Sequence, residues 1–136
     1  MEISFSKQNG RVPVTIMHLT GNVDASNYTD VIAKAQESFD GGVRDLLIDL
    51  SKVPYVSSAG LMSLHAVVLI FSGNSAKSKE GGRPSFRSID PQRDDVGLHH
   101  VKLLSPQTAV EQVLDVVGLK QFLNIHTDLE TAVQSY

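Results

Sequence analysis

The stretch Val53-Pro54-Tyr55-Val56-Ser57-Ser58-Ala59-Gly60-Leu61 decides the fold, because it joins two apolar segments of different length. The segment before it, Leu46–Leu50, is a short and largely apolar run, which is typical of a buried strand. The segment after it continues from Ser58 to Phe71 and has helical length. A buried strand is therefore expected to lead into a helix here, with two adjacent serines at the helix start.

Ser57 and Ser58 lie where a helix exposes free backbone N–H groups and a partial positive charge. Such a position suits a hydroxyl that caps the helix, and it also suits a phosphate group. A phosphorylated serine would add about −1.5 to −2 charges at pH 7 to a neutral surface, which would eject a partner docked there. Capping and phosphorylation are compatible, and the residues alone leave both open.

A nucleophilic serine is a third interpretation of the same pair. The chain has no Gly-x-Ser-x-Gly elbow. His65 follows Ser58 by seven residues, which is about 10 Å along a helix and too far for direct proton transfer. Another histidine would have to approach in space. The chain is therefore expected not to be an enzyme, and no catalytic residue is assigned.

Composition excludes several other classes of function. The chain has 136 residues, 41% of them hydrophobic, and a net charge of −3, which predicts one globular domain over residues 1–136 and no binding of nucleic acid. The absence of cysteine excludes disulfides, thiolate metal sites and a cysteine nucleophile. No cofactor motif is present. No signal-peptide pattern or membrane-spanning run occurs, so a cytoplasmic protein is expected.

The order of apolar patterns predicts the fold class. Strands are expected around residues 3–7, 11–20, 44–50, 98–104 and 122–126, with a tight turn at Gln8-Asn9-Gly10 between the first two. Helices are expected over Ala25–Phe39, from Ser58, after Ser105-Pro106 as far as Gly118, and after a capping box at Thr127-Asp128-Leu129-Glu130. This alternation predicts an α/β fold with a single mixed β-sheet of about five strands flanked by about four helices.

Residues 78–97 differ from the rest of the chain. They are polar, punctuated by Gly and Pro and nearly free of aliphatic residues, so a mobile loop insertion is expected there. His99 and His100 beyond it would face opposite sides of a strand, and His18, His65 and His126 are isolated in sequence. We therefore expect core or surface histidines and no metal site.

Three motifs together resemble the STAS domain, which bacterial anti-sigma factor antagonists share with the cytoplasmic tails of sulphate transporters. They are Leu19-Thr20-Gly21-Asn22-Val23-Asp24, Leu47-Ile48-Asp49-Leu50-Ser51-Lys52-Val53 and Ser57-Ser58-Ala59-Gly60-Leu61. The end of the chain is similar to the closing helix, strand and helix of the family. The resemblance covers nearly the whole chain except about residues 78–97.

The resemblance implies a STAS-like fold and a binding function in the regulation of transcription through a sigma factor. An unphosphorylated antagonist sequesters an anti-sigma factor serine kinase, phosphorylation breaks the complex, and a phosphatase restores it. By position, Ser58 matches the family's phosphoserine, with Ser57 as second choice. The implied partner-binding residues are Asp24, Ser57, Ser58, Ala59, Gly60 and Leu61. A monomer or weak homodimer without cofactor or membrane contact is expected.

The chain also departs from the family pattern, which often reads Asp-Ser-Ser-Gly or Asp-Ser-Thr-Gly. Ser57 stands in the Asp position and Ala59 replaces the second hydroxyl. Together with the insertion at 78–97, these departures leave an alternative function open. The chain would then be a non-phosphorylated STAS scaffold or a ligand-sensing interaction module in a signalling complex.

Overall fold

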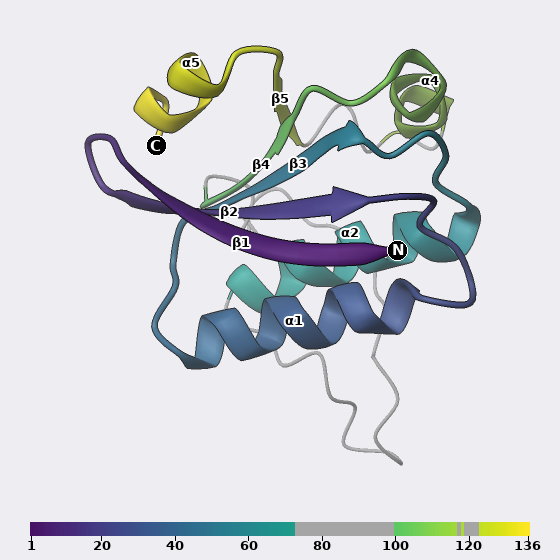
Figure 1. Ribbon diagram of the computed structural model, residues 1–136, viewed down its shortest axis with the longest axis horizontal. Coiled ribbons are helices and arrows are strands. Elements are labelled where there is room, and N and C mark those ends of the chain that lie inside the picture. Colours follow the sequence, from purple (N-terminus) through teal and green to yellow (C-terminus); the bar gives the residue numbers. More distant parts are fainter. Residues whose placement is uncertain (73–99, 117, 119–122) are drawn as a thin grey trace.

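The computed structural model describes residues 1–72, 100–116, 118 and 123–136. They form one five-stranded sheet in the order β1-β2-β3-β4-β5, in which β1 is antiparallel to β2 and the other neighbours are parallel (Figure 1). The strands are Glu2–Asn9 (β1), Pro13–Thr20 (β2), Leu46–Lys52 (β3), Val101–Leu104 (β4) and Asn124–His126 (β5). The helices of these residues are Tyr28–Asp40 (α1), Ser58–Phe71 (α2), Thr108–Val116 (α4) and Leu129–Gln134 (α5). The predicted mixed α/β class is confirmed.

Apolar side chains cover both faces of the sheet, because successive residues of a strand point to opposite sides. On one face, Met17 and Ile48 belong to the main core with α1, α2 and α4. On the other face, Ile16 and Leu47 pack against α5. Figure 1 shows α1 and α2 beside each other below the sheet, with α5 on the opposite side. This two-sided burial explains why β3 begins with three consecutive buried apolar residues.

The starts of α1 and α5 differ from the predicted ones, because side chains near them form hydrogen bonds with the backbone. α1 begins at Tyr28 rather than Ala25, because the Tyr28 N–H donates to Asp24 O and the Asp24 N–H donates to Asn27 Oδ1, which holds a turn before the helix. The predicted capping box at Thr127 is wrong. Asp128 is the N-cap of α5, and its Oδ2 accepts from the Thr131 N–H at 2.8 Å.

Other expected boundaries differ by a few residues. The predicted turn at Gln8-Asn9-Gly10 is wrong, because Gln8 and Asn9 belong to β1 and pair with β2, which begins at Pro13 rather than Arg11. β3 begins and ends two residues later than expected, and α4 begins at Thr108, after Ser105 with its positive φ of 50°. The expected loop at 78–97, the strand residues Leu98 and His99, and Phe122 lie outside the described residues. None of the described helices has the length and apolar character needed to cross a bilayer.

Candidate functional site

Ser57 caps α2, the helix that follows the central strand β3. Its backbone is extended (φ −78°, ψ 177°) and therefore not yet helical. Its Oγ accepts a hydrogen bond from the Gly60 N–H at 3.3 Å. The Ser57 carbonyl accepts from the Leu61 N–H at 2.9 Å, which begins the helical pattern. Ser57 therefore satisfies one of the free donors at the helix start, and Ser58 becomes the first helical residue.

The start of α2 is fixed against the loop that precedes α1. Val23 and Val56 form an isolated parallel bridge, in which the Val23 N–H donates to Tyr55 O and the Ser57 N–H donates to Val23 O at 2.9 Å. Gly60 is buried beneath this bridge, where a Cβ atom would lie 2.5 Å from Val23 O. The backbone of α2 can approach this closely only because residue 60 has no side chain.

Asp24 follows Val23 directly and has a fixed carboxylate. Its Oδ1 accepts from both the backbone N–H and the hydroxyl of Ser26, at 2.9 and 2.5 Å. The hydroxyl and then the backbone N–H of Ser26 lower the pKa of Asp24, so the group stays ionised at neutral pH. The Val23–Val56 bridge thus brings a negative charge to the side of the molecule where α2 begins.

Ser58 is exposed, and two large apolar side chains near it in the chain are exposed as well. Tyr55, three residues before it, retains 51% of its accessible surface, and Met62, four residues after it, retains 39%. Residues four apart on a helix share a face, so Met62 and Ser58 project from the same side of α2. We call Asp24, Tyr55, Ser58 and Met62 the Ser58 surface.

The residues that the sequence predicted for partner binding differ in their exposure to solvent. Ser58 is exposed, Ala59 is half-buried, and Gly60 and Leu61 are buried, so the last two support the surface through packing rather than by direct contact. Sequence reasoning assigned no role to Tyr55 or to Met62. The spacing of four residues from Ser58 was the available signal for Met62.

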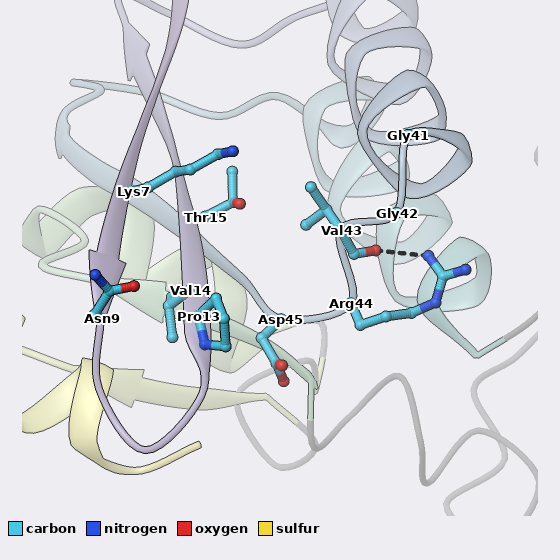
Figure 2. A pocket seen from close by; sticks show the side chains of 10 residues that line it. All are labelled: Lys7, Asn9, Pro13, Val14, Thr15, Gly41, Gly42, Val43, Arg44 and Asp45. Carbon is cyan, nitrogen blue, oxygen red and sulfur yellow. Dashed lines mark hydrogen bonds between the residues drawn. The ribbon is translucent and has the colours of Figure 1, made fainter.

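A separate pocket of about 310 Å³ lies at the opposite end of β3, between the β1–β2 hairpin and the residues that follow α1 (Figure 2). Its polar lining includes Lys7, Thr15, Arg44 and Asp45. The Arg44 guanidinium stacks 4.0 Å from the Phe39 ring centroid and donates to the carbonyls of Phe39 and Val43. Asp45 is hydrogen-bonded to His100. Arg44 and Asp45 are therefore already engaged by other groups of the protein, which leaves Lys7 as the charged side chain of the lining for which no such bond is described.

The two serines are expected to differ in their effect on stability. Ser57→Ala removes the cap of α2 and should lower the free energy of unfolding by about 1 kcal/mol. Ser58→Ala changes an exposed side chain and should stay within about 0.5 kcal/mol of the wild type. Urea denaturation of both variants measures the difference. Equal losses would contradict the assignment of Ser57 as the cap.

Comparisons with known proteins concern the family and the fold. Residues 6–71, which run from β1 to the end of α2, match the model of the STAS domain. The search of curated proteins finds no match for the chain.

Solved structures share the fold over nearly the whole chain. A candidate anti-sigma factor antagonist from Thermotoga maritima has a TM-score of 0.68 at 15% identity, over 97% of this chain and 92% of its own. An anti-sigma factor antagonist from Mycobacterium paratuberculosis has a TM-score of 0.65 at 17% identity, over 98% and 93%. The anti-sigma factor antagonist SpoIIAA in its unphosphorylated form has a TM-score of 0.60 at 17% identity, over 94% and 92%. At these identities the similarities establish the fold.

Proposed function

We propose that this chain, a STAS-domain protein, is an anti-sigma factor antagonist. In the unphosphorylated state it binds an anti-sigma factor serine kinase through the Ser58 surface, which keeps the kinase away from its sigma factor. Phosphorylation of Ser58 ends the binding, and a phosphatase restores it. The chain would thereby regulate transcription from the cytoplasm without touching nucleic acid.

One observation carries this proposal: Ser58 is exposed at the first position of α2, and the apolar side chains of Tyr55, three residues before it, and Met62, four residues after it, are exposed as well. Exposed aromatic and methionine side chains are enriched in the centres of protein interfaces. A kinase that docks on them would hold the Ser58 hydroxyl within its reach. SpoIIAA, which shares the fold, is solved in both an unphosphorylated and a phosphorylated form.

The serine at position 57 is compatible with this function, although the family often has Asp there. Asp and Ser are about equally good N-caps, so the start of α2 keeps its geometry with either residue. What changes is the charge beside Ser58. Ser57 is neutral, so a phosphate on Ser58 would meet no carboxylate from the preceding residue, and the helix dipole would favour it. The carboxylate of Asp24 remains as the acidic group of the surface.

Phosphorylation by a partner kinase tests the proposal. Incubation of the chain with ATP and purified anti-sigma factor serine kinases of the histidine-kinase fold is expected to place one phosphate on Ser58 with the partner kinase, detected by mass spectrometry of peptides. Ser58→Ala should abolish the product, whereas Ser57→Ala should retain it because the exposed hydroxyl is unchanged.

The absence of phosphate on both Ser57 and Ser58 after incubation with such kinases would contradict the proposal. That outcome would favour a scaffold or ligand-sensing module. The pocket of about 310 Å³ beside the β1–β2 hairpin would then be the place to look for a ligand.

A further inference from the structure

Three side chains on the α5 face of the sheet form a hydrogen-bonded chain that the proposed function does not use. Ser6 on β1, His18 on β2 and Asp49 on β3 come from three adjacent strands. Ser6 Oγ lies 2.7 Å from His18 Nε2, and His18 Nδ1 lies 2.8 Å from Asp49 Oδ2. A hydroxyl bonded to a base that a third group orients is the arrangement of an activated nucleophile.

The two hydrogen bonds between Ser6, His18 and Asp49 each have a defined donor and acceptor. Burial raises the pKa of Asp49, but hydrogen bonds from the Ser51 backbone and from His18 outweigh burial and lower it, so the group is a carboxylate at neutral pH. A carboxylate only accepts, which places a proton on His18 Nδ1. In the neutral ring, His18 Nε2 is then the acceptor, and the Ser6 hydroxyl donates to it.

The edge position of β1 supplies a further group. The Thr15 N–H donates to Asp45 O, so the backbone N–H and C=O groups of the odd-numbered residues of β2 point toward β3. The backbone groups of its even-numbered residues point toward β1. Ile16 is paired with Ser6, which therefore turns its own N–H toward β2. The N–H of the next residue, Lys7, points away from β2 at the open edge of the sheet, where it can donate to an oxyanion formed at Ser6.

We infer that Ser6 is a nucleophilic serine, with His18 as its general base and Asp49 as the positioning residue, which reacts with small activated acyl esters. The His18 side chain is 36% exposed, so the reagent approaches from solvent. Ser6 Oγ bonds to the acyl carbon while the ester C–O bond breaks. The serine proton passes through His18 Nε2 to the departing alkoxide, which leaves as an alcohol. Water, deprotonated by His18, then releases a carboxylic acid and restores Ser6.

A fluorophosphonate tests this inference on the full chain, because it traps activated serines. Oγ bonds to phosphorus, fluoride leaves, and the serine proton passes to His18 and then to buffer. Peptide mapping is expected to find the adduct on Ser6. Labelling should slow about 100-fold in His18→Ala and at least about 10-fold in Asp49→Asn. Imidazole in solution should partly restore labelling of His18→Ala, an effect that a merely structural role would not produce.

Ser4→Ala is the matched control, since Ser4 is also on β1, directly opposite His18 in the ladder. This variant is expected to label at the wild-type rate, and circular dichroism confirms that each variant is folded. No adduct on Ser6, an adduct that forms equally fast in Asp49→Asn, or equal labelling of exposed Ser58 would overturn the inference. These outcomes are independent of whether a kinase phosphorylates Ser58.

Discussion

Gly60→Ala is expected to lower the free energy of unfolding by about 3 kcal/mol, at the upper end of the usual cost of overpacking. The added Cβ would lie 2.5 Å from Val23 O and 2.6 Å from Val56 Cγ1. The side chain of Val56 has some freedom to move, but Val23 O is held as the acceptor of the Ser57 N–H. Relief of the clash would therefore break the bridge that joins the α1 and α2 loops.

Gly41→Ala is the matched control for this prediction. Gly41 ends α1 with an ordinary φ of −79°, and its nearest contact for a Cβ would be Glu37 O at 3.4 Å. Its effect on the free energy of unfolding should stay within about 0.5 kcal/mol. Urea denaturation measures both variants. If Gly60→Ala proved as stable as Gly41→Ala, the close approach of α2 to the Val23 loop would be refuted.

The sequence predicted the sheet well because its signals are local. The apolar run from Leu46 marked a strand buried on both faces. The polar break near Gly10 marked the hairpin that makes the sheet mixed, but the predicted turn at Gln8-Asn9-Gly10 was displaced, because Gln8 and Asn9 pair with β2. The helix start at Ser58 was also correct. Each of these features depends on periodicity or turn chemistry within a few neighbouring residues.

The site was less predictable because it depends on contacts between distant segments. Local sequence patterns do not predict the bridge between Val23 and Val56. This bridge lies so close to Gly60 that residue 60 can have no side chain, and Asp24 follows it directly in the chain. Local rules also left open which serine caps the helix. His18 and Asp49 are 31 positions apart in the sequence. The hydrogen bonds between Ser6, His18 and Asp49 could therefore be predicted only once the register of the strands was known.

A single negative charge at position 58 is expected to weaken binding of the partner kinase about 30-fold or more. Ser58→Glu would add a carboxylate to the surface that includes the exposed Tyr55 and Met62, whose apolar side chains a docked partner would remove from water. Burying an unpaired charge at an interface costs about 2 to 5 kcal/mol, and 2 kcal/mol is about 30-fold in affinity.

Ser58→Gln is the matched control, because it has the size of Glu without its charge. Its affinity for the kinase is expected to remain much closer to that of the wild type. Isothermal titration calorimetry with the purified kinase separates the two variants. Equal weakening by Gln and Glu would show that size, rather than charge, blocks the surface.

The central claim is that one phosphate at the start of α2 switches the binding surface. Its most direct test is the dissociation constant of the kinase for the unphosphorylated chain and for the chain phosphorylated on Ser58, measured by titration under the same conditions. We predict that phosphorylation raises this constant about 30-fold or more, and that phosphatase treatment restores it. Equal dissociation constants for the two forms would contradict the claim.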